Sequence, residues 1–235
     1  MSAPVIRPGV KAFVFDLDGT LIDSVDAHVT TWIKAFKIAV GVLVSEDDVY
    51  PLIGMSGRDI VRRVLGKVDE RTYAKIRWIK DRAFMRELKE GRVTLFPGVI
   101  QALRILKKEG YLIGMASSTP NRLLLHIMDY LGITKFFDAV TGGDEVRRGK
   151  PDPEIFLRAM RKLSVDPHET VVVGDTPYDA CPAHKVGALP VLVNTCSAPN
   201  GFTVATFCMF HEFVEAIKAC VSCGKPLAES GQRSS

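Results

Sequence analysis

The fold of this chain is decided by the stretch Ala12-Phe13-Val14-Phe15-Asp16-Leu17-Asp18-Gly19-Thr20. Its first four residues form a continuous apolar run, which is typical of a strand buried on both faces of a sheet. Asp16 and Asp18 follow this run directly. Because ligands bind at the carboxyl ends of strands in open parallel sheets, we predict that both carboxylates reach a ligand site.

Further apolar runs alternate with helical patterns along the rest of the chain. The runs are residues 112–116, 170–173 and 189–193, and the helical patterns are residues 99–108, 121–131 and 153–163. Strands that alternate with helices of this length favour a parallel sheet covered by helices on both faces. The predicted fold class is therefore α/β, with a doubly wound, Rossmann-like parallel sheet.

Residues 24–92 interrupt this alternation, because they carry helical spacing and no convincing strand. One apolar helical face is formed by Val29, Trp32, Ile33, Phe36 and Val40, and a second amphipathic segment covers residues 71–88. We predict an α-helical cap domain at residues 23–93, inserted into a core made of residues 1–22 and 94–224. The polar residues 225–235 are expected to form a disordered tail.

The composition argues against several classes of function. The 235 residues include 31 basic and 27 acidic side chains, and the excess of +4 is spread along the chain, so nucleic acid is not an expected partner. No stretch of about 18 residues is apolar enough to span a membrane, and residues 1–11 lack a signal-peptide pattern. We expect a cytoplasmic protein without a membrane partner.

The five cysteines give no clear site. Cys220 and Cys223 form a C-x-x-C pair, but no second pair completes the four ligands of a structural zinc. Whether these or other cysteines form disulfides stays open at this point.

Asp16 and Asp18 repel each other unless a cation lies between them or one is protonated. Both outcomes suit phosphoryl chemistry, because Mg²⁺ bridges carboxylate and phosphate and a protonated carboxyl can protonate a leaving alcohol. The segment from Phe13 to Ser24 resembles the Asp-x-Asp-Gly-Thr signature of the haloacid dehalogenase-like (HAD) hydrolase superfamily. The similarity to its phosphoglycolate phosphatase and β-phosphoglucomutase branch extends from residue 11 to about 195. It implies that Asp16 is the nucleophile, that Asp18 is general acid and then base, and that both help to bind Mg²⁺.

A second motif, Ser117-Ser118-Thr119-Pro120-Asn121, follows the predicted strand at residues 112–116. Thr119 before Pro120 predicts an N-cap followed by proline at the first helical position, and a helix N-terminus offers free N–H groups to an anion. The resemblance implies that Ser117 binds the phosphoryl group. We expect Ser118, Thr119 and Asn121 to contact the substrate.

A third motif, Gly149-Lys150-Pro151-Asp152-Pro153, holds a lysine between glycine and proline just before a helix. An ammonium placed between a carboxylate and a phosphate dianion reduces their mutual repulsion. The motif is similar to the family's lysine motif, which implies a catalytic role for Lys150.

The fourth motif, Gly174-Asp175-Thr176-Pro177-Tyr178-Asp179, follows the run at residues 170–173. The resemblance implies that Asp175 is a direct Mg²⁺ ligand and that Asp179 binds through water or a hydrogen bond. Pro182 departs from the family pattern, because proline has no N–H for the helix interior. We expect it to alter the start or the angle of the helix.

The cap supplies two candidate substrate contacts. His28 matches a histidine that relatives use near the leaving group, and Arg58 lies in a loop that matches one used in substrate selection. A guanidinium suits a second anionic group. No motif can be matched to the cap lysine that phosphonate-cleaving relatives use as a Schiff base.

Together these motifs predict a magnesium-dependent phosphatase that hydrolyses a small phosphorylated metabolite, such as phosphoglycolate or a sugar phosphate, through an aspartyl-phosphate. One alternative is a β-phosphoglucomutase-like phosphosugar mutase, which would share every core residue. A catalytically silent binding protein is the other alternative, although Asp16, Asp18, Lys150 and Asp175 are all present. The sequence leaves open whether the protein is a monomer or a homodimer.

Overall fold

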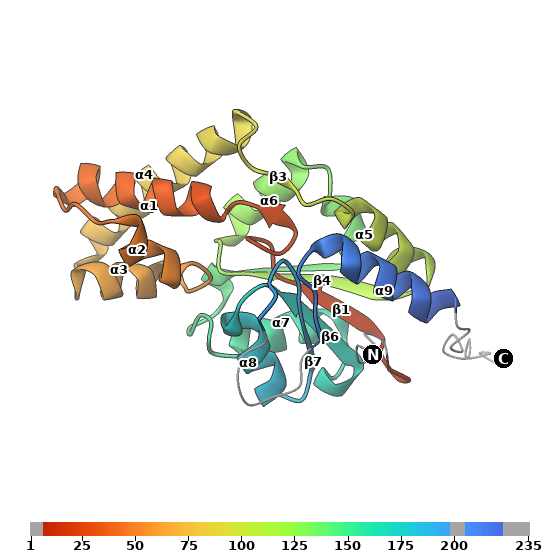
Figure 1. Ribbon diagram of the computed structural model, residues 1–235. Helices are drawn as coiled ribbons and strands as arrows, with labels where there is room; N and C mark the ends of the chain where they lie inside the picture. The colour runs from red at the N-terminus through yellow and green to blue at the C-terminus, as the bar shows by residue number, and fades with distance from the viewer. Residues whose placement is uncertain (1–6, 198–204, 223–235) are drawn as a thin grey trace.

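The computed structural model of the chain describes residues 7–197 and 205–222 (Figure 1). The predicted tail at residues 225–235 lies outside the described residues, and so does Cys223. A sheet covered by helices makes up most of the described part of the molecule, and the helices of residues 25–89 extend from one end of it.

Six parallel strands form the core sheet, in the order β5-β4-β1-β6-β7-β8. Their bounds are β1 Ala12–Phe15, β4 Leu112–Ser117, β5 Ala139–Gly142, β6 Thr170–Gly174, β7 Leu189–Leu192 and β8 Ala205–Thr206. The predicted α/β class with a parallel sheet is confirmed. The apolar runs of the sequence do not predict β5 or β8, because β5 reads Ala-Val-Thr-Gly and β8 has two residues.

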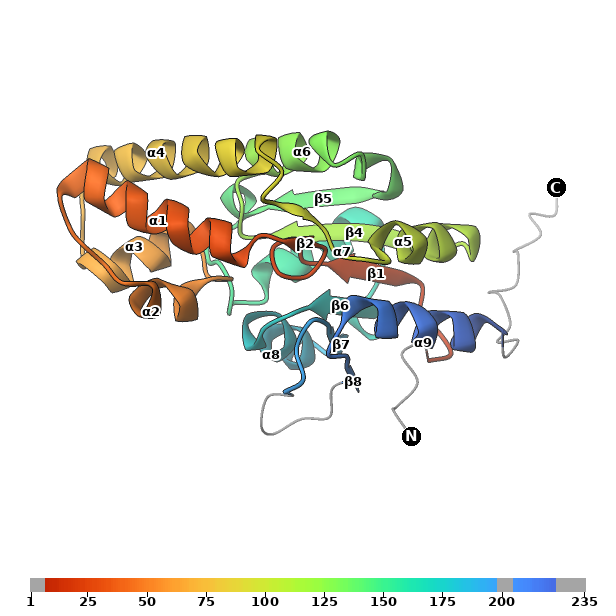
Figure 2. The same ribbon diagram turned by 45° about the horizontal axis from the view of Figure 1, so that its top comes forward.

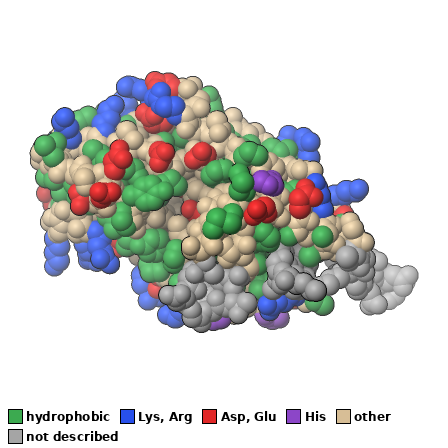
Figure 3. Space-filling view, viewed as in Figure 1, with side chains coloured by type: hydrophobic (Ala, Val, Ile, Leu, Met, Phe, Trp, Pro, Cys, Tyr) green, Lys and Arg blue, Asp and Glu red, His purple; other side chains and the backbone are tan. Residues whose placement is uncertain are grey.

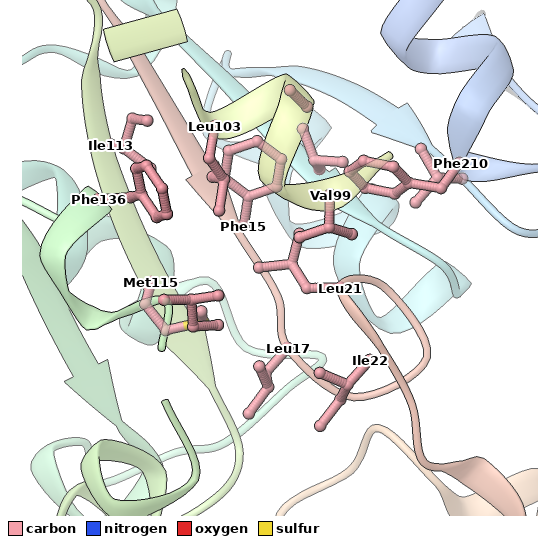
Figure 4. Packing of buried hydrophobic residues seen from close by; sticks show 14 of the residues in the cluster. Phe15, Leu17, Leu21, Ile22, Val99, Leu103, Ile113, Met115, Phe136 and Phe210 are labelled. Carbon is pink, nitrogen blue, oxygen red and sulfur yellow. The ribbon is translucent and has the colours of Figure 1, made fainter. Parts of the chain in front are cut away.

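Helices cover both faces of this sheet. They are α5 Val99–Lys108, α6 Asn121–Tyr130, α7 Glu154–Leu163, α8 Pro177–Lys185 and α9 Phe210–Ser222. Side chains alternate across a strand, so Phe13 and Phe15 of β1 pack on one side with α5, α6 and α9, as Figure 4 shows for part of this cluster. Ala12 and Val14 pack on the other side with α7 and α8. The strand that carries Asp16 is thereby fixed from both faces.

The remaining helices form a separate group, visible at the left of Figure 2. They are α1 Val25–Val40, α2 Glu46–Val49, α3 Gly57–Leu65 and α4 Glu70–Lys89. Trp32, Phe36, Ile60 and Ile76 belong to a hydrophobic cluster of their own. A two-stranded antiparallel pair, β2 Ile22–Asp23 with β3 Thr94–Leu95, connects this group to the core. We infer that residues 23–93 act as the cap domain.

Short 3₁₀ segments complete the structure, at η1 Tyr50–Leu52, η2 Thr134–Phe136, η3 Gly143–Glu145 and η4 Pro167–Glu169. None of the helices within residues 7–197 and 205–222 combines the length and the apolar character that crossing a bilayer would require. On the face drawn in Figure 3, Lys and Arg side chains lie mainly along the edges of the molecule rather than in one patch.

One helix boundary differs from the expectation, and Pro182 lies inside a helix. Helix α6 begins at Asn121 with Pro120 as its N-cap residue, so Thr119 is not the cap. Helix α8 continues through Pro182 to Lys185. Pro182 is the sixth residue of this helix, so its missing N–H removes one hydrogen bond near the helix start and the later turns still form.

Two of the five cysteines form a disulfide in the structure. Cys196 and Cys208 form a disulfide, which joins the segment after β7 to the segment after β8. Cys181 and Cys220 are free thiols.

Candidate active site

The order of the strands brings three of the sequence motifs together. Strand β1 lies between β4 and β6 and runs parallel to both. Because parallel strands end at the same edge of the sheet, Asp16 after β1 is flanked by Ser117 at the end of β4 and by Asp175 after β6. Asp16 and Ser117 are buried, at 4% and 1% exposure.

Lys150 reaches the same point from the loop before α7. Its Nζ donates to Asp16 Oδ1 and to Asp179 Oδ1, both at 2.7 Å. Lys150 is 1% exposed, and burial alone would lower its pKa, but the two carboxylates raise the pKa above the ordinary lysine value. The ammonium therefore stays charged between two buried carboxylates.

A group of three carboxylates offers a site for a cation. Oxygen atoms of Asp16, Asp175 and Asp179 all lie within 4.8 Å of one another. Burial raises the pKa of Asp16 to about 7, against the opposing effect of Lys150, and burial together with Asp179 and Asp16 raises the pKa of Asp175. A hard divalent cation that prefers oxygen ligands would relieve this repulsion, so the donor set fits Mg²⁺.

Gly19 gives Asp175 the space it occupies. A Cβ atom at position 19 would lie 2.2 Å from Asp175 Oδ2, and the backbone of Gly19 has a φ of +77°, which favours glycine. The neighbouring Thr20 Oγ1 donates to Asp175 Oδ1 at 2.9 Å. The Asp-Gly-Thr part of the motif thus holds Asp175 through close packing and a hydrogen bond.

Asp18 points to a different set of partners. Its Oδ1 accepts from Ser24 Oγ at 2.9 Å and lies 2.7 Å from His28 Nε2, and its Oδ2 accepts from Thr119 Oγ1 at 3.2 Å. Burial would raise the pKa of Asp18, but His28 holds it well below the usual range. Burial lowers the pKa of His28, against the opposing attraction of Asp18.

The side chain of Asp18 does not belong to the three-carboxylate group, although the sequence predicts Mg²⁺ binding for this residue. The resemblance assigns the contact to its backbone carbonyl, and that contact stays a prediction. Ser117 Oγ accepts from the backbone N–H of Thr119 at 3.1 Å. Ser118 Oγ donates to the carbonyl of Gly54 at 2.8 Å, which joins the core to the cap.

The model of the family described as haloacid dehalogenase-like hydrolase matches residues 13–193. The chain belongs to this family. The predicted resemblance and the prediction of a hydrolase are confirmed.

Named relatives of this HAD hydrolase are phosphatases. A probable phosphatase IndB from Dickeya dadantii is 33% identical over 74% of this chain and 76% of its own length. A phosphorylated carbohydrates phosphatase from Thermotoga maritima is 32% identical, covering 76% of this chain and 82% of the relative. A phosphoglycolate phosphatase from Salmonella typhimurium is 31% identical, covering 76% and 79%.

Solved structures share the fold of this HAD hydrolase. A hydrolase from Pseudomonas syringae has a TM-score of 0.70 and 26% identity, covering 78% of this chain and 84% of that one. A β-phosphoglucomutase from Clostridium difficile has a TM-score of 0.73 and covers 91% of this chain and 99% of its own. Its 21% identity supports a common fold only.

A small cavity of about 40 Å³ lies between the cap and the core of the HAD hydrolase. The core side contributes Asp16, Asp18, Ser117, Ser118 and Thr119, and the cap side contributes His28, Trp32, Ile53, Gly54, Met55, Gly57, Ile60, Arg77 and Lys80. His28 lines this cavity, and its predicted contact near the leaving group stays a prediction. Its ring also stacks on Phe84, with centroids 4.2 Å apart.

Lys80 is the functional candidate that the sequence motifs do not reveal. It lies on α4 and is 2% exposed. The signal that could have found it is its spacing, because the buried residues of α4 are Ile76, Lys80, Phe84 and Leu88, four residues apart. A lysine inside the apolar stripe of a helix is turned toward the interior.

Two predicted substrate contacts lie away from this cavity. The Arg58 guanidinium donates two hydrogen bonds to the Glu70 carboxylate in a bidentate pair, at 2.7 and 2.8 Å, and the Arg58 side chain is 61% exposed. Asn121 donates its backbone N–H to Asp144 at 2.7 Å, and its side-chain oxygen is buried without a hydrogen bond to any described residue. The substrate roles of both residues stay predictions.

Proposed function

We propose that this protein is a magnesium-dependent phosphatase that hydrolyses a small phosphate monoester through an aspartyl-phosphate on Asp16. The observation that carries this proposal is the buried arrangement of Lys150 between Asp16 and Asp179, with Asp175 beside them. A buried carboxylate at a strand end can act as a nucleophile when nearby cations neutralise the incoming phosphate. The phosphatase names of the relatives support the same reaction class.

In the first step, an oxygen of Asp16 attacks phosphorus and the bond between phosphorus and the ester oxygen breaks. The electron pair of that bond stays on the leaving oxygen, which takes a proton from Asp18. Asp18 is ionised in the present arrangement. A phosphate dianion entering beside it raises its proton affinity, so Asp18 takes up a proton with the substrate.

In the second step, Asp18 removes a proton from a water molecule that attacks the phosphoryl group. The bond between Asp16 and phosphorus breaks, which releases inorganic phosphate and restores the carboxylate. The hydrogen bond from His28 holds the Asp18 carboxylate in place for both transfers. Ser117 lines the cavity that contains Asp16, and the Lys150 ammonium donates to Asp16, which supports a role for both groups in binding phosphate oxygens.

Mg²⁺ would be held by Asp16, Asp175 and Asp179, and when bound it supplies positive charge that stabilises the transferring phosphoryl group. Lys150 supplies the fixed part of the same charge. The cavity of about 40 Å³ has room for only a few water molecules, so the cap must open to admit an ester. Reclosing it would exclude bulk water.

The test is a phosphate-release assay over small phosphate esters, with and without Mg²⁺, for the wild type and Asp16→Asn. We expect Mg²⁺-dependent release by the wild type and a loss of about 10³-fold or more in Asp16→Asn, because the amide cannot form the acyl phosphate. Equal metal-dependent turnover by both proteins would remove Asp16 from the mechanism. Trapping the phosphorylated protein with a labelled ester tests the intermediate directly.

The mutase alternative is separated in the same assay. A mutase would convert a sugar 1-phosphate to the 6-phosphate with little release of inorganic phosphate. A phosphatase releases phosphate in proportion to the substrate consumed.

A further inference from the structure

Asn194 joins the segment after strand β7 to the loop that carries Gly19 and Thr20. Its Nδ2 donates to the backbone carbonyl of Gly19 at 2.8 Å and to that of Thr20 at 3.1 Å. Its Oδ1 accepts from the backbone N–H of Phe210, the first residue of α9, at 2.9 Å. One half-buried side chain therefore holds backbone groups of two segments that are far apart in the sequence.

The loop that Asn194 holds is also the loop that places Asp175. Gly19 packs so closely on the Asp175 carboxylate that a Cβ atom would overlap it, and Thr20 Oγ1 donates to Asp175 Oδ1 at 2.9 Å. Asn194 and Asp175 line the same cavity, which has a volume of about 430 Å³. Partners behind the ligands of a cation fix the orientation of those ligands. A shift of this loop would therefore shift one carboxylate of the proposed Mg²⁺ site.

The disulfide between Cys196 and Cys208 fastens the surroundings of Asn194. Cys196 lies two residues after Asn194, and Cys208 lies two residues before Phe210, so the disulfide closes beside the hydrogen bond between Asn194 and Phe210. It limits how far these two segments move apart. Both cysteines are exposed, and Cys208 lines the cavity of Asp175. An exposed disulfide is open to attack by a thiolate.

We propose that Asn194 is a positioning residue for the three-carboxylate cation site, and that the Cys196–Cys208 disulfide keeps Asn194 in place. The proposal rests on the proposed function, because it concerns the same Mg²⁺ site. Asn194 does not bind the cation in it, but acts on Asp175 through the backbone of Gly19 and Thr20. Asn194 and both cysteines lie beyond residues 13–193, the part of the chain that matches the family model.

Reduction of the disulfide would loosen this arrangement. A small dithiol supplies two electrons and two protons, so that the bond between the two sulfur atoms breaks, both cysteines become thiols and the dithiol is oxidised to its own disulfide. The segments after β7 and β8 are then free to separate, which weakens the hydrogen bonds of Asn194. We expect the reduced protein to bind Mg²⁺ less tightly, because Asp175 is held less firmly.

Calorimetric titration of the full chain with Mg²⁺, without substrate, tests the proposal. The wild type, Asn194→Gly and the control Thr195→Ala are each compared in the oxidised form and after reduction with dithiothreitol. Glycine suits the left-handed backbone of Asn194, whose φ is +56°, so the first variant removes the side chain without adding strain. The Thr195 hydroxyl accepts from the backbone N–H of Ser197, so the control removes a neighbouring polar group that does not hold the loop.

We expect the dissociation constant for Mg²⁺ to rise about 10-fold in oxidised Asn194→Gly and to stay within about twofold in Thr195→Ala. Reduction should raise it about fivefold in the wild type. Reduction should have no further effect in Asn194→Gly, because both changes act through the same hydrogen bonds. The variant Cys181→Ser/Cys220→Ser keeps the disulfide and should respond to reduction as the wild type does.

A wild-type affinity for Mg²⁺ in folded Asn194→Gly would overturn the proposal, because Asn194 would then serve the fold alone. An equal effect of reduction on both proteins, or none on the wild type, would overturn the link to the disulfide. If Asn194→Gly does not fold, Cys196→Ser/Cys208→Ser decides instead, and a wild-type affinity in that variant overturns the proposal. If Mg²⁺ binds as expected but no ester is hydrolysed, only the proposed phosphatase function fails.

Discussion

Lys150 and Lys80 are both almost completely buried, at 1% and 2% exposure, yet their surroundings are opposite. Lys150 in the core donates to two carboxylates at 2.7 Å, and its pKa is raised. Lys80 in the cap forms no hydrogen bond to any described residue and lies over Phe84 and Trp32, and its pKa is lowered to about 8. Lys150 is neutralised by two hydrogen-bonded carboxylates, whereas Asp81 lies 3.8 Å from the Lys80 ammonium and is shared with Arg77.

In the proposed mechanism, the core lysine acts on the phosphoryl group. Its charge is in place before the substrate arrives, and such preorganised groups need no rearrangement during the reaction. The cation on the cap side is held at a cost in stability, which a bound anion would offset.

The largest effect should come from removing the paired lysine. We expect Lys150→Met to lower kcat by about 10³-fold, because the charge opposing the phosphate and Asp16 is lost. The free energy of unfolding without Mg²⁺ should fall by about 3–5 kcal/mol, since Asp16 and Asp179 would remain buried without their cation. Steady-state phosphate release and denaturant titration measure the two changes.

Lys150→Arg is the control for this prediction. It keeps the charge but does not fit the two 2.7 Å contacts, so it should recover part of the stability and little of the activity. Added Mg²⁺ should stabilise Lys150→Met more than the wild type, because the three carboxylates then lack any other counter-charge. Full activity in Lys150→Met would contradict the assigned role.

Removing Lys80 should have the opposite effect on stability, because its ion pair with Asp81 at 3.8 Å does not offset its burial. A folded-state pKa of about 8, against an ordinary 10.5, means that holding the proton on buried Lys80 costs stability below pH 8. The cost falls away between pH 8 and 10.5, where the folded protein has already released the proton that the unfolded chain still holds. We expect Lys80→Met to be more stable than the wild type by about 1–3 kcal/mol at pH 7.

Denaturant titrations at several pH values between 7 and 10.5 check this expectation, with Lys89→Met to correct for the general effect of losing a positive charge. The advantage of Lys80→Met should shrink as the pH rises through this range. A Lys80→Met protein that is less stable than the wild type at pH 7 would show that the ammonium is well accommodated by the fold itself.

The same pair of lysines shows what could be predicted from the sequence. Lys150 lies in the sequence Gly-Lys-Pro-Asp-Pro, and this local sequence is sufficient to identify the motif. Lys80 lies on a helix whose orientation relative to the core is set by packing. A local sequence motif does not reveal that orientation. Only the four-residue spacing of Ile76, Lys80, Phe84 and Leu88 points to it.

A similar limit applies to the fold. The apolar runs predicted the interior strands β1, β4, β6 and β7, because strands buried on both faces need continuous hydrophobic residues. The edge strand β8 is held by only two residue pairs with β7, so it needs no such run. Pairing between Cys196 and Cys208 depends on where β8 returns beside β7, and the spacing of cysteines does not give that.

The smallest effect should come from Arg58, a cation that is paired on the surface. The motif predicts substrate binding, whereas the structure places its guanidinium on Glu70, 61% exposed and outside the cavity of Asp16. Exposed pairs contribute about 0–1 kcal/mol, so we expect Arg58→Ala to change the free energy of unfolding by less than about 1 kcal/mol. Its kcat/KM toward phosphoglycolate should stay within about threefold of the wild type. A larger loss would contradict this expectation and would mean that Arg58 turns from Glu70 toward the site when substrate binds.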